Sequence, residues 1–195
     1  YLIKIKTTSF IPINMTLEKT DDFLKNSTFE NIIFGFFFGL IATLFFSNLL
    51  VFFFTKKRTY ILYTAYLSSY GILNVFTSGL GFQFIYPNII WLQQFGALIF
   101  TAFAGISGVY FLKSYLNIED KGPYDKIIKI YIFLWPIPFL LLFTTSYFLA
   151  IRFVHFLVFL GSVIFILLIK SQIKKRSTEA QLSLYAFSFL LTGAA

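Results

Sequence analysis

The chain has 195 residues, of which 58% are hydrophobic, 22% are aromatic and 12% are charged, and its formal net charge is +8. Charged residues make up about 25% of an ordinary soluble domain, so this composition excludes a water-soluble fold and indicates that lipid covers much of the surface. The basic residues fall in short clusters between apolar runs, which favours a topology signal over nucleic-acid binding. The chain has no cysteine, which excludes disulfides, thiolate catalysis and Cys-ligated metals within it.

Residues 1–30 differ in pattern from the rest. Tyr1 to Thr7 alternate partly between apolar and polar residues and predict a half-buried strand, and the polar stretch Glu18 to Asn26 predicts a linker. We therefore expect residues 1–30 to be the end of an extracytoplasmic β-rich sensor domain with its linker, and residues 31–195 to be a transmembrane helical domain. Both ends of the sequence fall inside patterned segments, so we expect a truncated piece of a longer protein.

Long apolar runs predict an all-α, polytopic transmembrane helix bundle with a short N-terminal β remnant. The first run ends at Lys56-Lys57-Arg58, and the uncharged stretch that follows must turn at Gly79 to Asn88, which is rich in turn residues. A later run of about two spans is broken only by Arg152 and predicts a tight hairpin. The five complete spans are predicted at 31–55, 60–78, 89–112, 130–147 and 153–169, and 182–195 opens a sixth.

The distribution of Lys and Arg between the loops predicts the orientation. The loops after spans one, three and five hold three, four and four basic residues, whereas those after spans two and four hold none and one. Basic loops stay in the cytoplasm, so the N-terminus is expected outside, and the same clusters can contact lipid head groups. Trp91 is expected to anchor the outer end of span three at the interface.

The predicted spans carry little that resembles an active site. No Asp, Glu, Lys or Arg lies well inside any of them, which argues against ion-coupled transporters and proton pumps. We expect no catalytic residue, no cofactor, no metal site and no enzyme activity in this stretch. His155, the only histidine, lies close to Arg152, and we expect interfacial or interhelical hydrogen bonds there, with ligand contact or pH sensing as the alternative. Gln93 and Gln94 are likewise expected to make interhelical contacts, with ligand contact as the alternative.

Small residues and prolines mark positions of close packing and of helix breaks. Gly35 and Gly39 form a GxxxG motif, and Gly105 and Gly108 form a similar face on span three. Such faces favour close helix packing, with a homodimer as the alternative use. Pro136 and Pro138 predict a kink in span four, which is either a fixed shape or a hinge.

A set of short motifs carries a family resemblance. They are Gly35 to Gly39, Asn48-Leu49-Leu50, Tyr60-Ile61-Leu62-Tyr63, Gly79-Leu80-Gly81-Phe82-Gln83-Phe84 before Pro87 and Trp91, and Phe111-Leu112 with Tyr115-Leu116. In this order they resemble the bacterial seven-transmembrane receptors with diverse intracellular signalling modules. The resemblance implies a multi-pass receptor of the bacterial inner membrane, preceded by a β-sandwich that binds a carbohydrate-like ligand. It also implies a cytoplasmic effector module attached in cis.

Two functions of different classes follow. The first is a signal-sensing receptor region that passes an extracytoplasmic ligand signal to a cytoplasmic effector. In this hypothesis the helix bundle has two packings, and the ligand shifts the balance between them. The second is a permease core for a small uncharged solute, which would need a polar path and often an inverted repeat. The outside N-terminal segment, the uncharged spans and the resemblance favour the receptor.

Overall fold

A computed structural model describes residues 19–144 and 147–173 of the chain. Over these ranges the chain is helical and contains no strand. The elements are α1 (Thr20–Thr55), α2 (Arg58–Thr77), a π-helix η1 (Gly81–Ile85), α3 (Ile90–Tyr115), α4 (Pro123–Leu134), α5 (Pro136–Thr144) and α6 (Tyr147–Ile173). The predicted β remnant at Tyr1 to Thr7 and the predicted sixth span at 182–195 lie outside the described residues.

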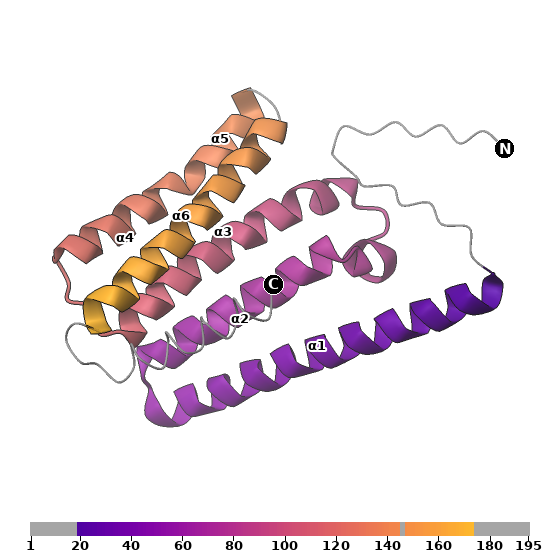
Figure 1. The fold of residues 1–195 in the computed structure, drawn as a ribbon, viewed down its shortest axis with the longest axis horizontal. Helices are drawn as coiled ribbons and strands as arrows, with labels where there is room; N and C mark the ends of the chain where they lie inside the picture. Colours follow the sequence, from indigo (N-terminus) through magenta and orange to yellow (C-terminus); the bar gives the residue numbers. More distant parts are fainter. Residues whose placement is uncertain (1–18, 145–146, 174–195) are drawn as a thin grey trace.

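The helices run back and forth beside one another, and α3 lies in the middle (Figure 1). On one side α3 packs along α2, which in turn packs against α1. On the other side α3 packs against α6, and α6 also contacts α4 and α5. The connections that bring neighbours together are short, as expected for antiparallel helices. The turn predicted at Gly79 to Asn88 is present and contains η1.

Among the helices that begin earlier than the apolar pattern predicts are α1 and α6. The first span was expected from Asn31, but α1 starts at Thr20 and includes most of the predicted linker. Asp21 and Asp22 lie in its first turn, where the positive end of the helix dipole favours acidic side chains. The fifth span was expected from Phe153, but α6 starts at Tyr147. Arg152 lies within this helix, and its guanidinium lies 4.1 Å from the centre of the Phe148 ring, one turn earlier.

Residues 113–129, which lie between the predicted third and fourth spans, form a loop only in part. Lys113 belongs to the last turn of α3, and α4 already begins at Pro123, so only residues 116–122 connect the two helices. Gly122 is the N-cap of α4 and Pro123 is its first residue, where the missing N–H of proline costs nothing. The Gly-Pro pair therefore marks the point where the connection ends and α4 begins. Span four is correspondingly made of two short helices, α4 and α5.

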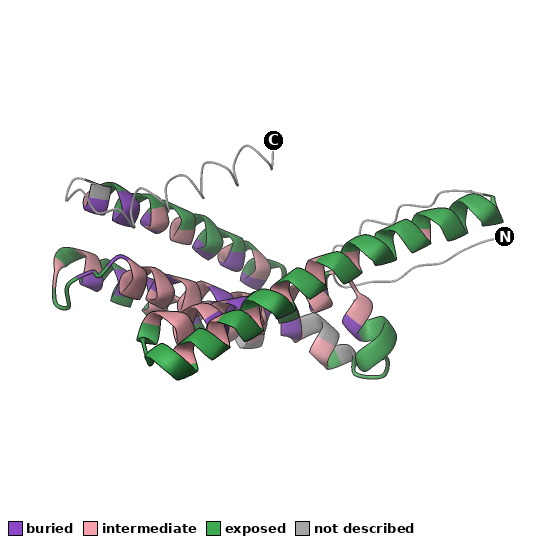
Figure 2. Cartoon of the chain, turned by 90° about the horizontal axis from the view of Figure 1, so that it is seen from below, coloured by how far each residue is buried: buried purple, intermediate pink, exposed green. Residues whose placement is uncertain are grey.

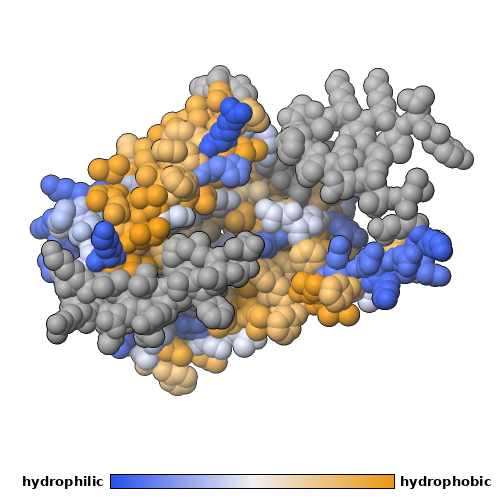
Figure 3. Space-filling view, viewed as in Figure 1, coloured by the Kyte–Doolittle hydropathy of each residue, from blue (hydrophilic) through white to orange (hydrophobic). Residues whose placement is uncertain are grey.

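Three helices of the described chain are long and apolar enough to cross a membrane, within Thr20–Thr55, Phe95–Tyr115 and Tyr147–Gln172. α1 contains no buried residue and is exposed over most of its length (Figure 2). Apolar surface covers much of the middle of the molecule, whereas polar surface gathers toward its two ends (Figure 3). Such a surface is stable only where lipid replaces water, so the chain is a multi-pass membrane protein.

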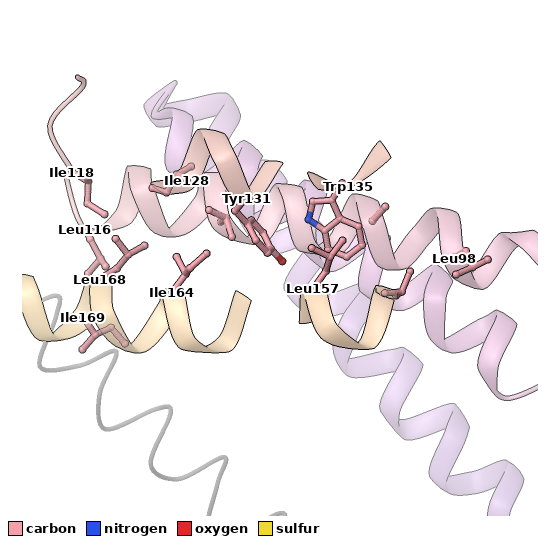
Figure 4. Packing of buried hydrophobic residues seen from close by; sticks show 13 residues of the cluster. Leu98, Leu116, Ile118, Ile128, Tyr131, Trp135, Leu157, Ile164, Leu168 and Ile169 are labelled. Atoms are coloured by element: carbon pink, nitrogen blue, oxygen red, sulfur yellow. The ribbon is translucent and has the colours of Figure 1, made fainter. Parts of the chain in front are cut away.

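The best-packed core lies between α3, α4 and α6. Its largest buried side chains include Trp135, Ile128, Leu157 and Leu168 (Figure 4). Trp135 is 1% exposed and stands at the junction of α4 and α5. This core therefore holds the point where the helix is interrupted between α4 and α5.

Candidate functional site

The loops that are rich in Lys and Arg lie at one end of the bundle. The α1–α2 turn with Lys56 to Arg58, the α3–α4 connection and the last turn of α6 with Lys170 meet there, on the left in Figure 1. The α2–α3 connection with η1 and the start of α6 lie at the opposite end. The tertiary structure thus places the basic loops at the same end of the bundle, which we call the basic end.

An ion-pair cluster at the basic end ties α3 to the start of α4. The Lys113 ammonium donates to Asp125 Oδ1 at 2.5 Å and to Asp120 Oδ1 at 2.6 Å. The second oxygen of Asp125 accepts from Lys129 Nζ at 2.8 Å and from the backbone N–H of Lys121 at 3.1 Å. The Asp125 side chain is 1% exposed, and its negative charge is compensated on all sides by these donors.

The charges of this cluster shift the titration of its carboxyl groups. Hydrogen bonds from Lys113 and Lys129, with a smaller part from the Lys121 N–H, hold the pKa of the Asp125 carboxyl well below its ordinary value despite the opposing effect of burial. The hydrogen bond from Lys113 also lowers the pKa of exposed Asp120. Both carboxylates therefore remain charged at any physiological pH, and the cluster acts as a permanent electrostatic clasp.

Sequence reasoning missed Asp125, although the sequence contains a usable signal. Asp125 follows Gly122-Pro123, which begins α4, so it lies in the first helical turn where acidic residues are favoured. Lys129 is four residues later and faces the same side of the helix, as the 2.8 Å ion pair shows. The contact with Lys113, twelve residues earlier, could not be read from spacing alone.

Two aromatic rings of the fourth span fit against glycines of neighbouring helices. A Cβ added at Gly105 of α3 would overlap the indole ring of Trp135, and one added at Gly161 of α6 would lie 2.6 Å from the Tyr131 hydroxyl. Tyr131 and Trp135 are one turn apart and their rings pack edge to face, 6.0 Å between centres. The segment thus inserts one ring toward α3 and one toward α6, at places where only glycine leaves room.

The predicted break of the fourth span lies directly beside these rings. α4 ends at Leu134 and α5 begins at Pro136, so Trp135 is the junction. Pro136 has no N–H for the carbonyl of Ile132, and that carbonyl instead accepts the Trp135 N–H at 3.2 Å. Pro136 is exposed, whereas Pro138 is fully buried. The proline-dependent interruption is present, and a hinge function there stays a prediction.

The other predicted site residues are not brought together into one pocket by the described contacts. His155 is exposed, and its Nδ1 lies 2.9 Å from the Ile151 carbonyl oxygen of its own helix rather than bonding to another helix. Arg152 is exposed and stacks on Phe148 within α6. The side chains of Gln93 and Gln94 lie outside the described ones. Ligand contact by these four residues stays a prediction.

The four packing glycines fall into two groups. Gly105 receives Trp135, and a Cβ at Gly108 would lie 3.2 Å from the Tyr66 ring of α2. Gly35 and Gly39 of α1 are exposed, and within the described chain a Cβ at either would meet no atom within 4 Å. Packing of the α1 pair against another helix or a second copy therefore stays a prediction.

The family described as 7TM diverse intracellular signalling matches residues 30–195, which is most of the chain. No curated protein and no solved structure gives a significant match. The matched residues include most of α1 and all the later described helices. They also include the junction at Trp135 and the ion-pair cluster of Asp125. Apolar helices long enough to cross a membrane, arranged as an antiparallel bundle with its basic loops at one end, agree with that match. The chain belongs to the 7TM diverse intracellular signalling family.

Proposed function

We propose that this chain is the signal-sensing membrane region of a receptor, which passes an extracytoplasmic ligand signal to an effector module in the cytoplasm. In this proposal the N-terminus lies outside a bacterial inner membrane, the basic end faces the cytoplasm and the stretch has no catalytic residue of its own. The preceding segment contributes to binding of a carbohydrate-like ligand, and the effector is attached in cis. The family supports a sensory membrane region, and the loop charges support the orientation.

The Trp135 junction is the observation that supports signal transmission through the helices. A signal must move one end of a helix relative to the other, and the fourth span is interrupted at Trp135 between α4 and α5. The α4 side is anchored at the basic end through Asp125 and Lys113, while α5 packs against α6 toward the opposite end. A displacement of α5 can therefore change the angle at the junction without breaking the clasp, provided that the two packings are close in energy.

The permease alternative receives less support from the packing. A permease needs a polar path, whereas the core between α3, α4 and α6 is filled by apolar and aromatic side chains. The polar atoms of the described spans are largely used within their own helices, for example by Ser107 and Thr101, whose hydroxyls donate to carbonyls four residues earlier. Neither feature offers a route for a solute.

The test uses the full-length protein with its effector, reconstituted in liposomes. Gly105→Ala should change the effector's basal output because the Trp135 ring must shift, whereas the matched variant Gly39→Ala, in open space, should leave it at the parent level. The same liposomes are tested for uptake of glycerol and glucose. Uptake above that of empty liposomes, together with equal effector output in all three proteins, would support the permease and overturn the receptor proposal.

A further inference from the structure

A groove of about 690 Å³ opens at the basic end between α1, α2 and α3. The start of α2 contributes Lys57 and Arg58 to its rim, α1 contributes Asn48, and the end of α3 contributes Ser114. Tyr63 and Phe111 form an aromatic wall, with ring centres 4.9 Å apart. Neither the Asp125 cluster nor the Trp135 junction lines this groove, so it is a separate feature of the molecule.

The groove is lined by cations and hydrogen-bonding groups and by no carboxylate. Lys57 and Arg58 are exposed and form no ion pair within the described residues. A smaller hollow beside Arg58 does include Asp120, but that carboxylate is bonded to Lys113. The groove itself therefore presents positive charge that the described protein does not neutralise.

Hydroxyl groups supply directional donors in the same place. The oxygens of Thr59 and Ser114 lie 2.7 Å apart across α2 and α3, and both residues line the groove. One of the two hydroxyl protons makes that bond, so the other hydroxyl can still donate to a ligand. Two cations with an O–H donor are the usual set of groups for holding phosphate oxygens, to which arginine binds in a fork.

We propose that this groove binds a phosphate group, carried by an anionic phospholipid. Lys57 and Arg58 would contact the phosphate, and the aromatic wall would lie along the glycerol and upper acyl region. The groove is at the end of helices whose outer faces are apolar, where head groups are found. Neighbouring Lys56 has its ammonium 5.4 Å from the centre of the Phe53 ring, as suits a cation at the edge of an apolar layer. The proposal is independent of the receptor function.

The test measures phospholipid binding to the full chain by native mass spectrometry from detergent. Parent protein is titrated with phosphatidylglycerol and, separately, with phosphatidylcholine. The double variant Lys57→Gln, Arg58→Gln removes the groove cations, and Lys126→Gln, Lys170→Gln removes two exposed cations that do not line the groove. Asn48→Phe keeps every charge and fills the groove from the α1 side. Size-exclusion profiles and melting temperatures confirm that each variant is folded.

The proposal expects parent protein to prefer phosphatidylglycerol, and the Lys57→Gln, Arg58→Gln variant to bind it about 30-fold more weakly, since each basic residue near the membrane contributes a factor of about five. Asn48→Phe should also weaken binding, because its ring occupies the groove. The control pair should change affinity by less than about threefold. Stabilisation of the parent by millimolar inorganic phosphate, without a phosphatidylglycerol preference, would support the phosphate site but assign it a soluble ligand. The site would be overturned if the groove pair and the control pair lost equal affinity for phosphatidylglycerol. It would also be overturned if neither phosphatidylglycerol nor inorganic phosphate had any effect on the parent protein.

Discussion

The indole ring of Trp135 fills the space that a side chain at Gly105 would need. The two residues belong to different spans, and the contact is made at the junction where α4 gives way to α5. A glycine on α3 thus decides how close the interrupted helix can approach the centre of the bundle. The shape of the fourth span depends on this fit as much as on the prolines that follow it.

This fit predicts that Gly105→Ala destabilises the bundle. The added methyl group overlaps the Trp135 ring, and relieving such overpacking costs about 1–3 kcal/mol. The matched variant Gly39→Ala places its methyl in open space and replaces a helical glycine, so it should be neutral or gain about 0.5–1 kcal/mol. Thermal unfolding in detergent, followed by circular dichroism, compares the two. Equal melting temperatures would show that Trp135 moves aside freely.

A second prediction concerns the ion-pair cluster. Asp125→Asn should lower the melting temperature because Lys113 and Lys129 lose a carboxylate that is shielded from water, and Asp120→Asn should lower it less because Asp120 is exposed. Lys113 remains partly shielded, 18% exposed, and keeps only Asp120 as its partner. A larger effect of Asp120→Asn would contradict the central place given to Asp125.

The same carboxylate predicts a dependence on pH. Because the pKa of Asp125 is lowered in the folded protein, its stabilising contribution is complete above the unfolded pKa of about 3.9 and is lost as pH falls through the folded value. The difference in melting temperature between parent and Asp125→Asn should therefore be constant between about pH 5 and 8 and shrink below about pH 4. A difference that varies between pH 6 and 8 would require another titrating group.

Membrane orientation gives a fourth prediction. Cysteines introduced at Lys57 and Lys174 should resist an impermeant thiol reagent in intact cells, whereas one at Gln83 should react, because the basic loops are expected in the cytoplasm. Gln83 is exposed in η1, at the end opposite the α1–α2 turn. The chain has no cysteine of its own, so it adds no background. Labelling of the cysteine at Lys57, without labelling of the one at Gln83, would show that the orientation is the reverse of the expected one.

The proline break gives the last prediction. Replacing both Pro136 and Pro138 by alanine restores two backbone N–H groups and should extend a continuous helix through Trp135. If the junction transmits the signal, the full-length protein should lose much of its ligand-dependent output while ligand affinity and expression stay near parent values. The readout is effector activity with and without ligand. An unchanged response would mean that the break only shapes the bundle.

The sequence by itself determined the membrane class and the alternation of basic and neutral loops, because these depend on composition and on the length of apolar runs. The family was indicated separately, by the resemblance of its short motifs. It also located the break at Pro136, since a missing N–H acts locally. Helix ends were less well determined: α1, α4 and α6 all begin before their predicted spans. Asp21 and Asp22 favour the early start of α1, and Gly122 with Pro123 favours that of α4, because each pair suits a helix N-terminus.

Only the tertiary structure decided which residues meet across helices. GxxxG spacing drew attention to Gly35 and Gly39, yet within the described chain the tight ring contacts fall on Gly81, Gly96, Gly105 and Gly161. The Asp125 clasp and the groove beside Arg58 likewise join residues from separate helices. The physical reason is that a span's hydrophobicity specifies that it enters the membrane, whereas its neighbours and rotation are set by van der Waals fit and charge pairing, which pattern along one chain does not encode.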